Sequence, residues 1–395
     1  MMTEAYKPHV SGITNYITLN KAALEKAGHQ VFVFTFGNPD HEDNELNVFR
    51  SPGLPIVDTG FYIGFQYTRP ARQLLYTMDV VHVHHPFLSG ILARRYCRPR
   101  GIPIVFTNHT RYDLYTHYYL PILPDPVGES IMQSYLPAFC RACDLVIAPS
   151  EGLKQVLIRL GVDVTIEVVP NGVDIQPFAH PKRVHERAEF GFQPEHVVLV
   201  YMGRLGPEKN LPFLLRAFAG AAQAYPHIRL LIIGDGPERD NLEDRARNMG
   251  LESKVHFTGM IPYPELPEYL AAADAFVTAS VTEVHPLSVI EAMASGLPVL
   301  GIQSPGIEDT IVDGETGLLS THDLAAFTAL MVRLATDGDL RSKMSAAARS
   351  ASAIYAIDRT TQIMLGHYRR VISQSRGRKR GLHARLARLL DKWKP

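Results

Sequence analysis

Two basic side chains stand five residues apart in a short loop, where together they could hold a pyrophosphate group. Arg204 and Lys209 lie in the glycine-containing segment 201–210, directly after an apolar run typical of a buried strand. A guanidinium offers a planar pair of donors and an ammonium a compact charge, so both could bind phosphate. In a transfer reaction they would stabilise the negative charge that grows on a departing diphosphate. The same spacing also fits a solvated surface loop, so both interpretations stay open for these two residues alone.

Two glutamates eight residues apart, Glu283 and Glu291, flank the expected start of a helix. Pro286 suits the first helical position, so we expect the helix to begin there and to close on Gly296. The free N–H groups and the dipole of a helix start attract phosphate, and the two carboxylates could accept hydrogen bonds from sugar and ribose hydroxyls. The alternative is an acidic residue before an ordinary helix, with Glu291 in a surface salt bridge.

The elements that must position these side chains alternate between short apolar strands and longer helical segments. Strands that are apolar on both faces belong to parallel sheets covered by helices. The strands are expected at residues 31–36, 80–83, 103–107, 145–148, 166–169, 197–202, 229–233, 275–278 and 298–301. A helix is expected over 13–27, where apolar residues recur at helical spacing and Gly28 closes the pattern.

A turn-rich segment at 170–174, followed by a polar stretch at 176–187, separates the strands into two groups. We therefore predict an α/β fold of two doubly wound, Rossmann-like domains that face each other across a cleft, since open parallel sheets bind ligands beyond the carboxyl ends of their strands. The expected parts are an N-terminal domain at 1–174, a C-terminal domain at 175–355, a helix returning toward the N-terminal domain at 356–375 and a basic amphipathic tail at 376–395.

The start of the chain leaves little room for the strand that should open the first domain. Residues 1–6 precede the expected glycine loop, and they offer almost no space for a buried strand. We therefore expect the first strand to be truncated and its parallel neighbour to lack a partner, which would cost stability.

The composition is that of a globular protein, and its balanced charge does not indicate a particular binding partner. The chain has 395 residues, of which 46% are hydrophobic and 20% charged, and its 40 basic residues balance its 40 acidic ones. Cys97, Cys140 and Cys143 are too few for a disulfide framework, so buried cysteines in a reducing compartment are expected. No signal peptide and no apolar run of about 18–20 residues is visible. A cytoplasmic location, peripheral on the cytoplasmic face of a membrane, is the expectation.

Taken together, the motifs resemble retaining glycosyltransferases of family 4, which have the GT-B fold. Arg204 with Lys209 and the glutamates eight residues apart carry the resemblance in the C-terminal half. Further segments that match are 6–13, 81–86, 170–174, 291–299 and 313–319. The resemblance covers about residues 1–370 and is closest to members that glucosylate diacylglycerol or mannosylate phosphatidylinositol.

The resemblance implies a role for each matched residue of the C-terminal domain, which would bind the nucleotide-sugar. Arg204 and Lys209 would bind the donor diphosphate, Glu291 would hold the ribose hydroxyls, and Glu283 would lie beside the donor sugar ring. The expected donor-binding set also includes Gly203, Val284, His285, Leu287 and Ser288.

The N-terminal domain would add two residues to the donor site. Gly12 would let its loop approach the phosphates closely, as a missing Cβ permits, and His109 would reach the donor sugar. The expected catalytic set is thus His109, Glu283, Arg204 and Lys209. The family usually has glycine where this chain has Pro286, which lacks one backbone N–H donor.

The resemblance implies no metal or other cofactor, since members of the family work without a required metal and the nucleotide-diphosphate sugar is the substrate. The segment from Asp337 to Asp339 resembles a metal-binding D-x-D pattern, but it falls between helical segments and is interpreted as a turn. Alternating histidines on a strand could bind a metal. His82, His84 and His85 match the family's strand end, where one lines the cleft and the others pack.

The acceptor side is predicted from an aromatic segment at 108–121, which is similar to that of members that glycosylate diacylglycerol. Tyr112, Tyr115, His117 and Tyr118 could line an amphipathic acceptor site, because a tyrosine is apolar along its ring and polar at its tip. The alternative is ordinary aromatic packing.

The tail carries eight basic residues and one acidic residue between 376 and 395. Its apolar residues share one helical face with basic residues around it, a pattern typical of an interfacial helix. The apolar set is Leu382, Leu386, Leu389, Leu390 and Trp393. An anionic membrane surface is therefore an expected partner, a disordered tail is the alternative, and nucleic acid is not expected because no recognition motif is present.

The expected function is transfer of a hexose, with retention, from a nucleotide-diphosphate sugar to a hydroxyl acceptor. A UDP-sugar such as UDP-glucose is favoured and GDP-mannose comes second, while the acceptor is a membrane lipid or a glycan. Two alternatives stay open: a GT-B sugar phosphorylase or epimerase, and a non-catalytic nucleotide-sugar-binding protein.

Overall fold

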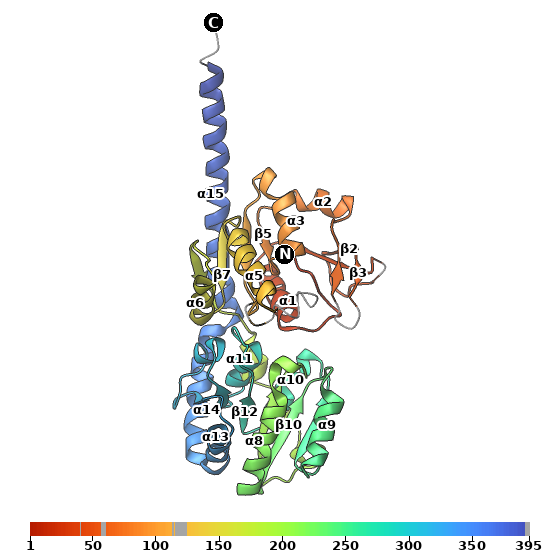
Figure 1. Ribbon diagram of the computed structural model, residues 1–395, viewed down its shortest axis with the longest axis vertical. Coiled ribbons are helices and arrows are strands. Elements are labelled where there is room, and N and C mark those ends of the chain that lie inside the picture. The colour runs from red at the N-terminus through yellow and green to blue at the C-terminus, as the bar shows by residue number, and fades with distance from the viewer. Residues whose placement is uncertain (40, 57–60, 113, 115–124, 392–395) are drawn as a thin grey trace. The chain divides into compact units, whose positions relative to one another are not determined.

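The computed structural model describes residues 1–39, 41–56, 61–112, 114 and 125–391 (Figure 1). The chain forms two compact units. Unit 1 consists of Met1–Pro170 together with Thr360–Pro395, and unit 2 consists of Asn171–Arg359. Each unit is an α/β structure built on a parallel sheet.

The sheet of unit 1 is built from short parallel strands that are mostly buried. One pair has the order β1-β2, and a second group has the order β5-β6-β7-β8. The strands are β1 (Val33–Gly37), β2 (Val48–Pro52), β5 (Val81–Val83), β6 (Ile104–Thr107), β7 (Leu145–Ala148) and β8 (Ile166–Val168). β3 (Leu54–Pro55) and β4 (Tyr62–Ile63) pair antiparallel and form a separate two-stranded sheet.

The first residues of the chain join β1 to β5. Met2 forms parallel bridges to Phe34 on β1 and to Val83 on β5. The Met2 N–H donates to the carbonyl of His82 at 2.7 Å, and the Phe34 N–H donates to the carbonyl of Met1 at 2.9 Å. The expectation of an unpaired neighbour was therefore wrong, because residues 1–3 form backbone hydrogen bonds to residues of both strands.

The helices of unit 1 begin with α1 (Gly12–Lys26), whose first turn is capped when Ser11 accepts a hydrogen bond from the Thr14 N–H at 3.1 Å. The other elements are α2 (Arg69–Leu75), α3 (Leu88–Tyr96), the 3-10 helix η1 (Arg98–Arg100), α5 (Asp125–Cys140) and α6 (Glu151–Arg159). All three cysteines are free, and Cys97 and Cys140 are buried.

The helix α15 (Ile357–Asp391) has its first three residues in unit 2 and the rest in unit 1 (Figure 1). Its apolar residues Met364, Leu365 and Tyr368 are buried in the same core cluster as Val105 of β6 and Ile147 of β7. Residues 376–391 have helical backbone.

The sheet of unit 2 has six parallel strands in the order β11-β10-β9-β12-β13-β14. They are β9 (Val197–Met202), β10 (Ile228–Ile233), β11 (Val255–Gly259), β12 (Ala275–Thr278), β13 (Val299–Ile302) and β14 (Gly317–Ser320). Alternate residues of the central strand β9 enter two separate cores, with Leu199 in one and Val200 in the other. Both faces are therefore covered, which explains why β9 is apolar throughout.

Helices cover both faces of this sheet. Phe218 of α8 (Leu211–Ala224) lies in the core with Leu199, whereas Ile290 of α11 (Leu287–Ala294) lies in the core with Val200. The remaining helices are α7 (Ile175–Ala179), α9 (Arg239–Asn248), α10 (Leu266–Leu270), α12 (Pro305–Glu308), α13 (Leu324–Thr336) and α14 (Gly338–Ser352). The 3-10 helices are η2 (Arg187–Phe190), η3 (Pro207–Lys209), η4 (Tyr263–Glu265) and η5 (Ala353–Tyr355).

The strand order decides which loops meet. β9 pairs with β10 on one side and with β12 on the other, all in parallel. Loops after parallel strands emerge at the same edge of the sheet. The loop that follows β9 therefore lies between the loop that follows β10 and the loop that follows β12.

Candidate functional site

The loop after β9 is held in place by backbone contacts to the loop after β10. The Leu205 N–H donates to the carbonyl of Asp235 at 2.9 Å, and the Leu205 carbonyl accepts from the Glu238 N–H at 3.0 Å. Gly234 has a φ of +135°, and a Cβ there would lie 2.0 Å from the carbonyl oxygen of Gly203. Gly234 is thus required for the close approach of the two loops, a role that sequence reasoning missed.

Lys209 ends η3 within this loop, and its side chain pairs with Glu283 from the loop after β12. Lys209 Nζ lies 2.6 Å from Glu283 Oε1, and both side chains are mostly buried. Burial disfavours both charges, but their mutual attraction outweighs it, so the pKa of Lys209 is raised and that of Glu283 is lowered. Both groups therefore stay charged at neutral pH.

Arg204 has a different partner from Lys209. Its guanidinium is half exposed and lies 3.2 Å from Oε1 of Glu208, which is four residues further along the same loop. Its backbone carbonyl accepts a hydrogen bond from the hydroxyl of Tyr201 at 3.1 Å. The Arg204 side chain is half exposed, whereas that of Glu208 is mostly buried. Water therefore screens the guanidinium, which is free to turn toward a ligand.

The loop after β12 leads into α11, whose first residue is Leu287. Pro286 is the N-cap residue with extended backbone, so the expected helix start at Pro286 was one position early. Proline fixes φ near the helical value, but its ψ of 120° keeps it outside the helix. The backbone N–H groups of Leu287 and Ser288 are consequently at the open end of the helix.

Two contacts fix the shape of this loop. The Gly306 N–H donates to the carbonyl of Glu283 at 3.1 Å, and a Cβ on Gly306 would lie 2.4 Å from the backbone of Val284. The side-chain amide of Asn171 donates to the carbonyl of His285 at 2.8 Å. Asn171 belongs to the matched segment 170–174, but nothing in the sequence indicates its partner.

The ring of His285 is buried, and its Nδ1 has no hydrogen-bond partner among the described residues. Burial lowers the pKa of His285 to about 3, so the ring is neutral. It packs edge-on against Tyr355, with ring centroids 5.1 Å apart. Leu287 is buried as well, whereas Val284 and Ser288 are partly exposed.

Glu291 is buried on the second turn of α11, with 3% of its surface exposed. The hydroxyl of Tyr263 donates to Glu291 Oε1 at 2.9 Å. Burial raises the pKa of Glu291 to about 7, although the bond from Tyr263 acts in the opposite direction. The alternative of a surface salt bridge at Glu291 was therefore wrong. No sequence signal indicated Tyr263 as its partner.

In unit 1, Gly12 begins α1, and a Cβ built on it would meet nothing within 4 Å. His109 follows β6 and is partly exposed, and its ring packs against Tyr16 with centroids 4.6 Å apart. Burial lowers the pKa of His109 to about 3. Its Nε2 lies 3.1 Å from Nδ1 of His84.

The other strand-end histidines have protein partners. His82 contacts the hydroxyls of Thr107 and Tyr368 at 2.7 and 2.6 Å, and His85 contacts the hydroxyl of Thr3 at 3.2 Å. Within the described part of the chain, no group of three or more histidine, cysteine or acidic residues is arranged to hold a metal ion.

The D-x-D segment belongs to a helix start. Asp337 is the N-cap of α14, where its side chain accepts from the Leu340 N–H at 2.9 Å, and Asp339 lies in the first turn. The expected turn is thus a helix cap.

The aromatic segment is described only in part. Tyr112 is buried and its ring meets Phe87 edge-on, with centroids 5.3 Å apart, as the packing alternative predicts. Tyr115, His117 and Tyr118 lie outside the described residues.

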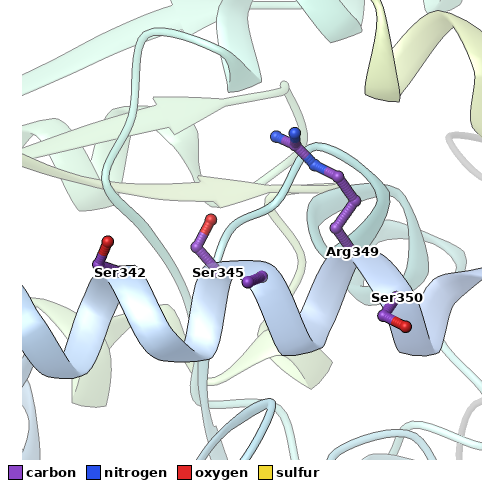
Figure 2. A pocket seen from close by; sticks show the side chains of 5 residues that line it. Ser342, Ser345, Arg349 and Ser350 are labelled. Atoms are coloured by element: carbon purple, nitrogen blue, oxygen red, sulfur yellow. The ribbon is translucent and has the colours of Figure 1, made fainter.

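Two surface hollows of unit 2 are lined by other residues. The larger, of about 470 Å³, lies along α14 beside Arg349 and three serines (Figure 2). Arg349 donates to the carbonyl of Ser295, which follows the end of α11 remote from Glu283. The second, of about 340 Å³, includes Asp174 and Glu268. Neither lining includes Lys209 or Glu291.

Two α/β units, each built on a parallel sheet, are the architecture of the GT-B class of glycosyltransferases. The second unit carries Lys209 and Glu283 on loops and Glu291 on α11. Residues 10–177 match the family model Glycosyltransferase Family 4, and residues 183–351 match Glycosyl transferases group 1. The chain belongs to this family of glycosyltransferases and is an enzyme that transfers hexoses. The predicted fold and family are confirmed.

Two relatives and one solved structure illustrate the similarity. The chain is 33% identical over 338 residues to the alpha-monoglucosyldiacylglycerol synthase of Streptococcus pneumoniae, a match that covers 82% of this chain and 76% of that enzyme. It is 30% identical to a GDP-mannose-dependent alpha-mannosyltransferase of Mycobacterium tuberculosis, over 81% of this chain and 82% of that enzyme. The structure of Anabaena HepE in complex with UDP and glucose superposes with a TM-score of 0.73 at 19% identity, covering 93% of this chain and 97% of HepE.

Among the described residues, no helix combines the length and the hydrophobicity needed to cross a bilayer.

Proposed function

We propose that this enzyme transfers glucose from UDP-glucose to diacylglycerol, with retention at the anomeric carbon. The name of the S. pneumoniae relative, an alpha-monoglucosyldiacylglycerol synthase, supports the sugar and the acceptor. An α-linked product made from an α-linked donor requires retention. GDP-mannose is the second donor, because the M. tuberculosis relative is named for it.

The observation that carries the proposal is the contact between Lys209 and Glu283. A lysine ammonium has three N–H donors, and Glu283 accepts from it at 2.6 Å. The remaining donors can bind the diphosphate while Glu283 keeps the ammonium oriented. Arg204 and the open N-terminus of α11, at Leu287 and Ser288, would add to the positive potential around the phosphates.

The carboxylates have separate roles in this proposal. Glu291 accepts from the ribose hydroxyls, because a carboxylate has two oxygens and Tyr263 uses one of them. Glu283 lies beside the donor sugar, with Val284 and His285 continuing the same loop. His109 contacts the sugar, and the backbone at Gly12 and Gly203 approaches the phosphates.

Transfer then proceeds without a metal ion, since the cations and the helix dipole offset the charge on the departing diphosphate. The acceptor hydroxyl attacks the face from which the diphosphate leaves. A phosphate oxygen takes the proton of that hydroxyl as the new C–O bond forms and the bond to the diphosphate breaks.

The basic tail brings the enzyme to its lipid acceptor. Helical backbone continues to Asp391, and the sequence from 376 onward carries eight basic residues. Each basic residue near an anionic leaflet contributes about 1 kcal/mol to binding. A peripheral position on the cytoplasmic face of a membrane follows from this proposal.

A donor and acceptor screen tests the proposed function. UDP-glucose and GDP-mannose are each incubated with the enzyme, with and without vesicles that contain diacylglycerol, and released nucleotide and glycolipid are measured. We expect UDP and an α-glucosyl lipid from the first donor with vesicles. Transfer only from GDP-mannose would overturn the donor, and nucleotide binding without any release would favour a pure binding protein. Release of glucose 1-phosphate on adding inorganic phosphate would favour a phosphorylase.

A further inference from the structure

Two neighbouring strands of unit 1 each carry a histidine just beyond the carboxyl end. β5 pairs with β6 in parallel, with Val83 opposite Phe106. The residues that follow, His84 and His109, therefore emerge at the same edge of the sheet. Nδ1 of His84 lies 3.1 Å from Nε2 of His109, and His84 is fully buried whereas His109 is partly exposed.

Both rings are uncharged at neutral pH. Burial, followed by the repulsion of neighbouring histidines, lowers the pKa of His84 well below its ordinary value. The pKa of His109 falls to about 3 for the same reasons. A hydrogen bond between two neutral imidazoles contains a single proton, so one ring donates and the other accepts.

The second nitrogen of His84 decides the direction of this bond. Nε2 of His84 is buried and has no hydrogen-bond partner among the described residues. If His109 donated, His84 would have to carry its hydrogen on Nε2, as an N–H group buried without an acceptor. If His84 donates, Nε2 carries only a lone pair, that is, an acceptor without a donor. Buried N–H groups without an acceptor are rarer in protein interiors than buried acceptors without a donor. His84 therefore donates from Nδ1.

We infer that His84 is a positioning residue, which locks His109 in the tautomer that carries hydrogen on Nδ1. The free nitrogen of His109 is then a hydrogen-bond donor, suited to an oxygen of the donor sugar. The ring of Tyr16 meets both histidines edge-on, with centroids 5.6 Å from His84 and 4.6 Å from His109, and so limits their rotation. The inference rests on the proposed role of His109 as a sugar contact.

Nitrogen-15 NMR of the imidazole groups reports the tautomer directly and needs no substrate. We expect wild-type His109 to be neutral with hydrogen on Nδ1. In His84→Phe, which removes both nitrogens but fills the site, His109 should move to the Nε2–H tautomer that free imidazole side chains prefer. His84→Asn places an amide near the position of Nδ1 and should restore the wild-type tautomer.

A matched control is Tyr368→Phe, which removes the hydroxyl 2.6 Å from Nδ1 of His82 and leaves the His84–His109 bond in place. Tyr368→Phe should keep the wild-type tautomer of His109. His84→Phe should lower the turnover of UDP-glucose about tenfold, as loss of an orienting partner does elsewhere. The affinity for UDP, measured by calorimetry, should not change, because neither His84 nor His109 is proposed to contact the nucleotide.

The outcomes separate this inference from the proposed function. Wild-type His109 with hydrogen on Nε2 overturns the inference by itself, even if His84→Phe fails to fold. A folded His84→Phe variant with an unchanged His109 tautomer overturns it as well. If the tautomers behave as expected but His109→Ala keeps full turnover, the sugar-contact role of His109 is wrong while its orientation by His84 stands.

Discussion

The side-chain amide of Asn171 donates to the backbone carbonyl of His285 at 2.8 Å, although 114 positions separate the two residues in the sequence. Asn171 is the first residue of unit 2, and His285 lies in the loop between β12 and α11. The matched segment 170–174 thus does more than connect two units, because it fixes the loop that contains Glu283.

Asn171→Ala should weaken UDP binding several-fold, because the loop loses an anchor beside its carboxylate. The buried carbonyl of His285 would lose its donor, so we expect the free energy of unfolding to fall by about 1 kcal/mol. Calorimetry with UDP and urea unfolding measure the two effects. Asn241→Ala is the control, since Asn241 is an exposed residue of α9 that bonds the side chain of Glu238. Unchanged UDP affinity in Asn171→Ala would show that the loop keeps its shape without the amide.

Lys209→Ala should abolish most transfer and also destabilise unit 2. The variant leaves the mostly buried Glu283 carboxylate without its cation, at a cost of about 2 kcal/mol in unfolding free energy. Adding Glu283→Gln to Lys209→Ala removes the stranded charge and should recover most of this stability without recovering activity. Unfolding in urea and turnover of UDP-glucose are measured for wild type and for the two variants. Recovery of turnover in the double variant would argue against a direct role for Lys209 in binding phosphate.

The stability of the enzyme should depend on pH through Glu291. Burial raises its pKa from the ordinary 4.5 to about 7, so the folded state holds a proton that the unfolded state releases. The stabilisation is complete below pH 4.5 and is lost as the pH rises toward and through 7. The shift corresponds to about 3 kcal/mol in unfolding free energy.

Glu291→Gln tests this dependence, because the amide can still accept from Tyr263. Between pH 5 and pH 8, we expect wild type to lose about 3 kcal/mol more than Glu291→Gln in urea unfolding. Burial also raises the pKa of Glu4 to about 7, but Glu4 contributes equally to both proteins. Equal pH dependence in the two proteins would mean that Glu291 is ionised throughout this range. UDP binding should strengthen more steeply with rising pH in wild type than in Glu291→Gln, since the ionised carboxylate is the better acceptor.

Gly306→Ala should displace the loop that carries Glu283, although Gly306 itself lies on α12. The new Cβ would lie 2.6 Å from the carbonyl oxygen of Glu283 and 2.4 Å from the carbonyl carbon of Val284, so the backbone of the loop must move. Overpacking of this kind costs about 2 kcal/mol, and UDP affinity should fall with it. Gly366→Ala is the matched control, because a Cβ on this residue of α15 meets nothing within 4 Å. If Gly306→Ala binds UDP like wild type, the loop tolerates a shift and its position is not critical.

Removal of residues 377–395 should abolish binding to vesicles that contain anionic lipid. The deletion takes away seven of the eight basic residues of the tail, each worth about 1 kcal/mol near an anionic leaflet. Co-sedimentation with anionic and with neutral vesicles measures the effect, and UDP affinity reports on the integrity of unit 2. Equal sedimentation of the full chain and the shortened chain with anionic vesicles would show that the tail does not bind the enzyme to the membrane.

Strands buried on both faces were predictable, whereas edge strands were predicted only in part, since β8 was expected at 166–169 but β14 was missed. The predicted bounds of β7, β9 and β12 agree with the structure, because each is an uninterrupted apolar run. β11 and β2 were missed since they lie at sheet edges, where residues such as His256 and Arg50 are partly exposed and interrupt the pattern.

The candidate site was predictable only as separate pieces. Lys209 and Glu283 were each expected in the site, but their contact depends on β9 pairing with β12, which no local pattern reveals. The partners Tyr263 and Gly306 carry no local signal either. Each contacts a residue at least 22 positions away in the chain, so its role becomes visible only when the chain is folded.

The loop that carries Arg204 is anchored through main-chain atoms. Leu205 is held by its own N–H and carbonyl, and Gly203 by its N–H bond to Ile233 at 3.0 Å. These bonds use main-chain atoms alone, so they do not depend on the side chain at position 204. Substitutions of Arg204 can therefore probe the proposed contact with the diphosphate separately from the folding of the loop that carries it.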